Sequence, residues 1–142
     1  MRDYVLLYLN GRRLEIRGEP AFSTLAEFCR NDRRLTGTKV VCAEGDCGAC
    51  AVLVGRPTDG EMRYRAVTSC IQFVYQLDGC HVVTVEGLKY PEGPNPVQEA
   101  FVRCHGAQCG FCTPGFVVST YGLVEGRQQP VDIETLRRGL VG

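Results

Sequence analysis

The chain has 142 residues, of which 44% are apolar and 23% are charged, a composition that indicates a folded globular protein and excludes a disordered one. Sixteen basic residues balance sixteen acidic ones, so the sequence shows no charge excess for binding nucleic acid or an anionic membrane. The longest apolar run, Val5–Leu9, is far shorter than the roughly 20 residues of a membrane span. No apolar segment typical of a secretory signal follows Arg2 and Asp3, so we expect a cytoplasmic location.

The first part of the chain predicts two strands followed by a helix. Residues 4–9 and 12–17 are expected to form a β-hairpin, because Asn10 and Gly11 between them are a strong two-residue turn signal. Ser23 is expected to cap the helix that follows. Further strands are predicted at residues 51–54, 62–67 and 81–85, with a turn at 56–60. Strands of this kind with one helix packed across them predict a small α+β sheet.

The composition changes at residues 90–96, where three prolines in seven residues indicate an extended linker. Beyond it the sequence predicts no strands. Three helices are expected there, at residues 97–103, at 114–124, and after a cap at Asp132. We therefore expect two modules, residues 1–88 and residues 89–142, and the second is short for a hydrophobic core of its own.

Nine cysteines stand out in a chain of this length. Their number is odd, so they cannot all pair internally, and in a reducing compartment clustered thiols more often bind metal than form disulfides. Six of them lie in two groups of nine residues each, 42–50 and 104–112. Cys70 lies between the groups, and Cys29 and Cys80 stand apart with no spacing that predicts a ligand role. Metal binding is therefore favoured over disulfides.

The first cysteine group has the spacing C-x4-C-x2-C, and one further cysteine follows at a distance. Its members are Cys42, Cys47, Cys50 and Cys70. This is the pattern of plant-type [2Fe–2S] sites. Gly45 and Gly48 permit the positive φ angles that aim backbone N–H groups at the negatively charged cluster. A four-cysteine zinc site is the alternative, but such sites usually contain two C-x2-C pairs.

The second cysteine group, Cys104, Cys109 and Cys112, repeats the same spacing. Cys104, however, is expected to close a helix, and no cysteine follows Cys112 in this sequence. Three thiolates are an incomplete set for zinc or for a two-iron cluster. Spacing alone leaves the role of this group open.

Two motifs resemble a known family. Residues 36–50, from Thr36-Gly-Thr-Lys to Cys50, and residues 105–115, from His105 to Thr-Pro-Gly115, resemble the iron–sulfur part of the molybdenum hydroxylases. That family includes xanthine dehydrogenase, aldehyde oxidoreductase and carbon monoxide dehydrogenase. The resemblance is strongest to the small iron–sulfur subunit of bacterial xanthine dehydrogenases, and it covers essentially the whole chain.

The resemblance implies a fold and a set of ligands. It implies an N-terminal β-grasp, ferredoxin-like domain whose [2Fe–2S] cluster is bound by four cysteines, Cys42, Cys47, Cys50 and Cys70. It also implies a helical bundle with a second [2Fe–2S] cluster, to which Cys109 and Cys112 contribute while Cys104 does not. Gln108 matches a glutamine that contacts the pterin of the molybdenum cofactor. In the family, two more ligands come from a C-x-C motif after a stretch that resembles residues 140–142, so we expect the helical module to be truncated here.

The function that the resemblance implies is electron transfer. Electrons would pass from a molybdopterin-binding large subunit through the [2Fe–2S] clusters to FAD in another subunit or domain, and no catalytic residue is expected in this chain. One alternative is a free-standing ferredoxin-type carrier, and another is a structural zinc-binding domain. The motifs do not distinguish a purine, an aldehyde, carbon monoxide or an aromatic heterocycle as the substrate of the whole enzyme.

Overall fold

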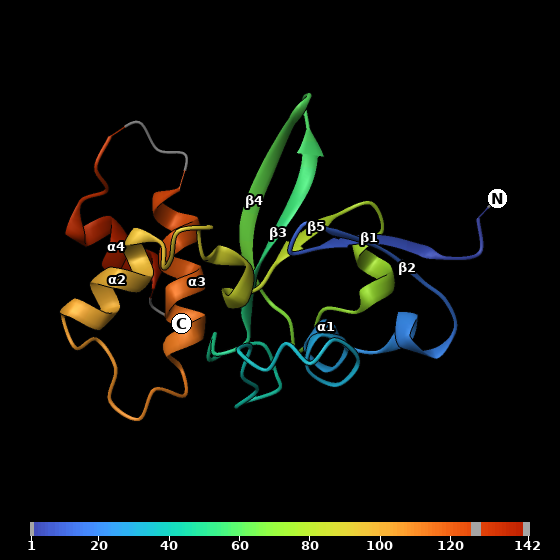
Figure 1. The fold of residues 1–142 in the computed structure, drawn as a ribbon, viewed down its shortest axis with the longest axis horizontal. Coiled ribbons are helices and arrows are strands. Elements are labelled where there is room, and N and C mark those ends of the chain that lie inside the picture. The colour runs from blue at the N-terminus through green and yellow to red at the C-terminus, as the bar shows by residue number, and fades with distance from the viewer. Residues whose placement is uncertain (1, 126–128, 141–142) are drawn as a thin grey trace.

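The computed structural model describes residues 2–125 and 129–140. It contains one five-stranded mixed sheet with three helices, α2, α3 and α4, gathered at one side of it (Figure 1). These three helices are α2 (Pro96–Arg103), α3 (Thr113–Val124) and α4 (Ile133–Gly139). None of the helices in the described ranges is both long enough and apolar enough to span a membrane.

The sheet begins with the predicted hairpin. Strands β1 (Val5–Leu9) and β2 (Arg12–Ile16) pair in antiparallel fashion. Asn10 and Gly11 join them with positive φ angles of 49° and 80°, a turn whose twist matches that of the flanking strands. This part of the prediction is confirmed.

The second hairpin is longer than predicted. Strands β3 (Ala51–Thr58) and β4 (Glu61–Thr68) are each eight residues long, and β3 extends to Thr58, into the segment 56–60 that the sequence predicted as a turn. Only Asp59 and Gly60 turn the chain, with φ angles of 53° and 81°. A two-residue turn of this kind lets the ladder continue up to residue 58.

The last strand, β5 (His81–Val83), lies in the middle of the sheet. It is parallel to β1 and antiparallel to β3, which gives the strand order β2-β1-β5-β3-β4. It ends two residues before the predicted boundary. Three short 3₁₀ helices lie in the connections: η1 (Glu19–Phe22), η3 (Val74–Leu77) and η4 (Val85–Leu88).

The first helix is capped by Thr24, so the prediction of Ser23 as the cap was wrong. The backbone N–H of Glu27 donates to the Thr24 hydroxyl at 3.2 Å, and the Thr24 N–H donates to the Glu27 carboxylate at 3.0 Å. This reciprocal capping box needs a Glu three residues after the cap, which Ser23 lacks. The helix runs as α1 (Leu25–Glu27) and continues as the π-helical turn η2 (Phe28–Asp32).

The main hydrophobic core lies between one face of the sheet and the first helix. Its members include Leu7, Leu25, Phe28, Val52, Leu77 and Val82. All six are less than 3% exposed, so most of the apolar surface of the first module is buried here.

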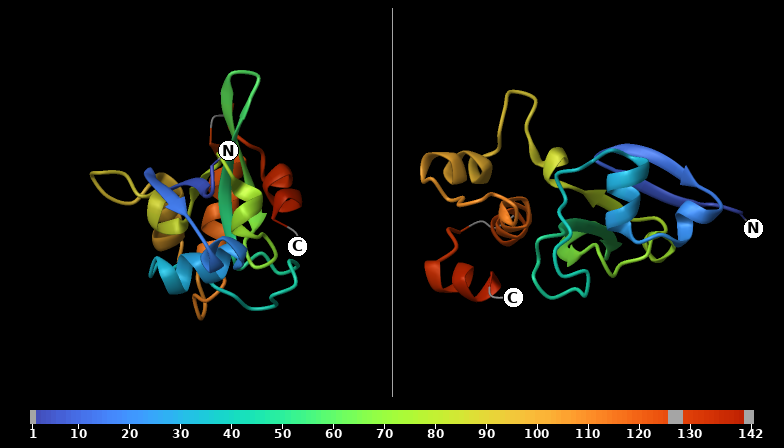
Figure 2. Two further views of the ribbon diagram at one scale, coloured as in Figure 1. Left: turned by 90° about the vertical axis from the view of Figure 1, so that its right-hand side faces the viewer. Right: turned by 90° about the horizontal axis from the view of Figure 1, so that it is seen from below.

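The helical part shares a second core with the sheet. On β3, Val52 and Val54 face the main core, whereas Ala51 and Leu53 face α3 and pack near Val118. Strand β3 is therefore buried on both faces, by the main core on one side and by α3 on the other. The second module is short, and it gains buried surface by packing α3 against the sheet. Figure 2 shows the three helices beside the sheet from two further directions.

Side chains cap the helices α2 and α4, and of these two caps the sequence predicted Asp132. Asn95 caps α2 by accepting N–H groups of Val97 and Gln98, and Asp132 caps α4 by accepting the N–H of Thr135 at 2.8 Å. The structure confirms the predicted α+β class and the three helices. Residues 90–96 are not extended throughout, because Tyr90 and Gly93 pair with each other across a turn and Pro96 already belongs to α2.

Candidate metal centre

The first cysteine group lies on an irregular loop between the first helix and β3. Within this loop Ala43, Gly45 and Gly48 have positive φ angles of 59°, 85° and 71°. Left-handed residues alternating with ordinary ones turn successive backbone N–H groups toward one side of a loop, which creates a binding site for negative charge. The predicted role of the two glycines is consistent with this backbone.

Backbone N–H groups point at the sulfur of Cys42. The N–H of Cys47 lies 3.5 Å from that sulfur. This N–H, followed by the N–H groups of Glu44 and Asp46, lowers the pKa of the Cys42 thiol to about 6. The thiol of Cys47 also donates to the same sulfur. Cys42 is thus prepared to be a thiolate, the form that binds iron, at neutral pH.

Cys50 and Cys70 form the buried side of the group. They pack together with Ala26 as a small buried cluster. The pKa of the Cys70 thiol is raised to about 11, first by burial and then by the adjacent Cys50 thiol, while the N–H of Gly45 acts in the opposite direction. The charge of Cys42 also raises this pKa. The four cysteines are thus linked by pairwise interactions, of Cys42 with Cys47 and with Cys70, and of Cys70 with Cys50.

The chemistry of this donor set fits a [2Fe–2S] cluster. Four thiolates held this closely repel one another unless positive charge lies between them, and iron would supply that charge. Inward N–H groups would offset the negative charge that remains on the sulfurs. Within the described ranges, no three His, Cys, Asp or Glu side chains surround one point closely enough to bind a single metal ion. A two-iron cluster, by contrast, divides its four ligands between two metal atoms.

Two residues outside the motif shape the site, and the sequence did not single them out. An added Cβ on Gly45 would lie 2.5 Å from the Cδ1 atom of Ile71, so the side chain of Ile71 covers the loop at Gly45. Ser69 is completely buried and donates its hydroxyl to the carbonyl oxygen of Cys50 at 2.7 Å. Both residues adjoin Cys70, and that adjacency is the only signal that the sequence offers for them.

The second cysteine group is open to solvent. Cys104 ends α2, Cys112 precedes α3, and Cys109 lies between them beside Gly110, whose φ angle is 84°. All three cysteines are exposed. Gln108 is also exposed, on the same connecting segment. Cys109 and Cys112 thus lie on one short loop before a helix, whereas Cys104 belongs to the helix before it.

The two cysteine loops face a common cavity of about 590 Å³. Cys47 of the first loop and Cys112 of the second both line it, together with residues of β4, α3 and α4 such as Thr68, Phe116 and Gly139. The fold therefore brings the two motifs, which are far apart in the sequence, to one region of the molecule.

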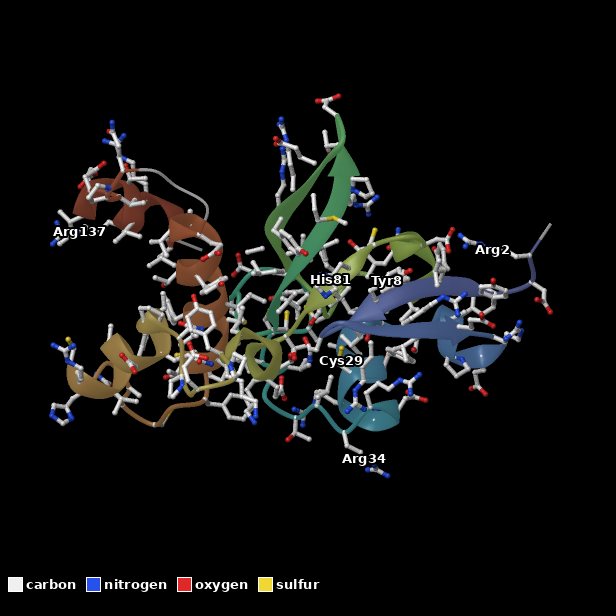
Figure 3. All side chains as sticks on the ribbon, turned by 45° about the horizontal axis from the view of Figure 1, so that its top comes forward. Arg2, Tyr8, Cys29, Arg34, His81 and Arg137 are labelled. Atoms are coloured by element: carbon white, nitrogen blue, oxygen red, sulfur yellow. The ribbon has the colours of Figure 1, made fainter. Side chains whose placement is uncertain are left out.

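Cys29 and Cys80 lie away from this region. Both are buried in the main core, and Figure 3 shows Cys29 between the first helix and the sheet. Burial raises the pKa of the Cys29 thiol to about 12 and also raises that of Cys80. Thiols of this kind are unreactive packing groups.

Two family models match this chain. Residues 7–74 match the 2Fe-2S iron-sulfur cluster binding domain, and residues 84–142 match the [2Fe-2S] binding domain. Xanthine dehydrogenase 1 of Arabidopsis thaliana is 43% identical over 141 residues, which are 96% of this chain and 10% of that protein. Aldehyde oxidase 2 of Macaca fascicularis is 41% identical over 144 residues, 99% of this chain and 11% of that protein.

Solved structures agree with these matches. The aldehyde oxidoreductase from Desulfovibrio gigas superposes with a TM-score of 0.79 and 35% identity, covering 100% of this chain and 15% of that one. The chain belongs to the iron–sulfur region of the molybdenum hydroxylase family. Quinoline 2-oxidoreductase from Pseudomonas putida 86 matches with a TM-score of 0.69 and 29% identity, covering 97% of this chain and 90% of that chain.

Membership in the molybdenum hydroxylase family confirms the predicted family, the ferredoxin-like α+β fold and the class of cofactor, a [2Fe–2S] cluster. The chain spans about a tenth of the length of the curated relatives quoted above, so it corresponds to one part of larger enzymes. The assignment of individual cysteines and of Gln108, and the module boundary at residue 88, stay predictions.

Proposed function

We propose that this chain is the electron-transfer component of a molybdenum hydroxylase of the xanthine dehydrogenase type. The proposal rests above all on the convergence of four thiols under inward-pointing N–H groups in a family of [2Fe–2S] domains. The ligands of the first cluster are Cys42, Cys47, Cys50 and Cys70. When bound, such a cluster accepts and releases one electron without a change in its ligands.

The residues of the chain hold and screen that cluster. Cys50 and Cys70 bind from the buried side, and Cys42 and Cys47 bind from the loop. The N–H groups of the loop favour the charged sulfurs, so their number and aim adjust the reduction potential. Ser69 fixes the backbone of Cys50, and Ile71 covers the loop at Gly45.

The second motif contributes two ligands, Cys109 and Cys112, to a second [2Fe–2S] cluster. Their exposure suits a site completed by protein outside the described residues. Gln108 is exposed on the same segment and would contact the pterin of the molybdenum cofactor. The partners proposed here are a molybdopterin-binding large subunit and an FAD-binding subunit or domain in the cytoplasm, and one electron at a time would move from the first partner to the second.

The ligand assignment is tested by iron analysis and electron paramagnetic resonance of the reduced protein. Serine at Cys42, Cys47, Cys50 or Cys70 should abolish or alter the signal of the first cluster, because each variant removes one of its four thiolates. Cys80→Ser is the matched control, a buried cysteine outside the group, and should retain the signal. A colourless protein with zinc and no iron would contradict the proposal, and an unaltered signal in one variant would remove that residue from the site.

A free-standing ferredoxin is the second candidate function. Copurification distinguishes the two: a tagged chain in its native cell should bring down molybdenum and flavin if it belongs to a hydroxylase. Iron without molybdenum or flavin would favour the ferredoxin.

A further inference from the structure

The N-terminal turn of α3 lies in direct contact with the backbone of the first cysteine loop. A Cβ atom added to Gly115 would lie 2.4 Å from the carbonyl oxygen of Gly48 and 2.9 Å from the Cα atom of Ala49. Ordinary van der Waals contact begins near 3.4 Å. Both neighbours are backbone atoms, so no side-chain rotation relieves such a clash. Gly115 is buried, and any side chain there would push the helix and the loop apart.

The conformation of Gly115 itself does not require glycine. It lies inside α3 with helical backbone geometry, and it is not among the glycines with positive φ. Glycine inside a helix lowers the stability of the helix relative to alanine. The close approach of α3 to the loop is therefore the feature that requires a residue without a side chain at position 115.

The loop has little freedom to move away from α3. The carbonyl oxygen of Gly48 already accepts the N–H of Ala51 at 3.0 Å. On the other side, the carbonyl oxygen of Cys50 accepts both the hydroxyl of Ser69 at 2.7 Å and its N–H at 3.3 Å. The segment between Cys47 and Cys50 is therefore held between α3 and Ser69, and a displacement at Gly48 would reach both cysteines.

We infer that Gly115 is a positioning residue for both cysteine loops, an inference that rests on the proposed function. Gly115 follows Cys112 by three residues, and Gly48 directly follows Cys47, so their contact sets the separation of the two motifs. Figure 1 shows the loop of the first motif beside the lower end of α3, and Figure 2 shows the same proximity from below. With both clusters bound, the contact would shorten the path of the one electron that the reduced second cluster gives to the oxidised first cluster.

The test compares Gly115→Ala with Gly122→Ala in the complete protein that contains this chain. Gly122 lies two turns further along α3, and a Cβ there would meet the Cδ2 atom of Leu53 at 2.8 Å, a side-chain atom that can rotate away. Both variants add the same methyl group to the same helix. Three properties are measured: iron content, the resonance signal and midpoint potential of the first cluster, and the magnetic splitting between the two reduced clusters.

We expect Gly115→Ala to shift the signal and the potential of the first cluster and to weaken the splitting, whereas Gly122→Ala leaves all three close to the parent. Loss of iron in Gly115→Ala alone also supports the inference, provided that hydrogen exchange shows β1 and β2 as protected as in the parent. Unchanged spectra and splitting at full iron content in Gly115→Ala would overturn it. Equal losses in both variants would overturn it too, because a general weakening of α3 would then explain them. If the parent protein shows no two-iron signal, the proposed function fails before Gly115 is tested.

Discussion

The hydroxyl oxygen of Tyr64 lies 2.6 Å from Nδ1 of His81, across the strand that separates them. On the other side of the ring, Nε2 of His81 accepts the N–H of Gly11 at 3.2 Å. An acceptor nitrogen carries no proton, so the ring is neutral with its proton on Nδ1, which donates to Tyr64. His81 thereby ties the first hairpin to the second, and Figure 3 shows it in the middle of the sheet beside Tyr8.

Acid should therefore weaken the fold through His81. Burial lowers the pKa of His81 below its ordinary value of 6.5, so the unfolded chain binds a proton more readily than the folded one. The contribution of neutral His81 to the free energy of unfolding is complete above about pH 6.5. It falls as the pH drops from there toward the lower pKa of the folded state. Thermal unfolding of the parent and of His81→Gln between about pH 8 and about pH 5 measures this, and the parent should lose more stability on acidification. Parallel slopes would contradict the assignment.

Gly55 on β3 makes room for the Tyr64 ring. Gly55 pairs with Tyr64 on one side and with His81 on the other, and an added Cβ would lie 2.6 Å from the Cε1 atom of Tyr64. Gly55→Ala should therefore displace the ring and cost about 1–3 kcal/mol of unfolding free energy. In a Tyr64→Ala background the same change should cost much less, because the clash is absent. Denaturant titration of the four proteins checks this, and additive effects would show that the ring does not cause the cost.

Replacing the helix cap Asn95 should lower the free energy of unfolding more than replacing the other side-chain cap of the helical module, Asp132. Its side chain is completely buried, accepts two N–H groups of α2 and donates to the carbonyl oxygen of Leu88 at 3.0 Å. Asn95→Ala removes the cap and leaves that buried carbonyl without its partner, so we expect a loss of about 2–4 kcal/mol. Asp132→Ala is the control, an exposed cap of α4 that should cost about 1 kcal/mol. Equal losses in chemical denaturation would argue against a special role for Asn95.

Iron content tests whether Cys104 is a cluster ligand, as the cysteine spacing alone would suggest, or is not a ligand, as the family resemblance implies. Residues 1–142 expressed alone should bind about two irons, whereas the protein with a C-x-C motif should bind about four. In the longer protein, Cys104→Ser should leave the content near four, because Cys104 ends α2 outside the second loop. Cys109→Ser or Cys112→Ser should lower the content toward two. About four irons in the short chain, lost with Cys104→Ser, would show that Cys104 is a ligand.

The parts of the fold that the sequence predicted best are those determined by near neighbours in the chain. The turn at Asn10 and Gly11, the cap at Asp132 and the close cysteine spacings depend on a few adjacent residues. The wrong cap at Ser23 was also local, and the Glu three residues after Thr24 was the signal that would have corrected it.

The parts that the sequence left open depend on contacts between distant segments. Helix α3 is apolar on several sides, as its sequence from Thr113 to Val124 shows, so no stripe of polar residues indicated which side would face the sheet. Nothing in the local sequence linked Gly115 to Gly48, or placed Tyr64 against His81. Such contacts arise only once the strand order is known.

The burial of strand β3 on both faces limits how far this protein can be shortened. Because Ala51 and Leu53 are covered by α3, a chain cut at the linker would present a bare apolar strip beside the cysteine loop, with Leu88 exposed next to it. Exposed apolar patches of this kind favour aggregation. A minimal ferredoxin made from residues 1–88 would need polar replacements on the outer face of β3, and the two halves are better regarded as one folding unit with two motifs.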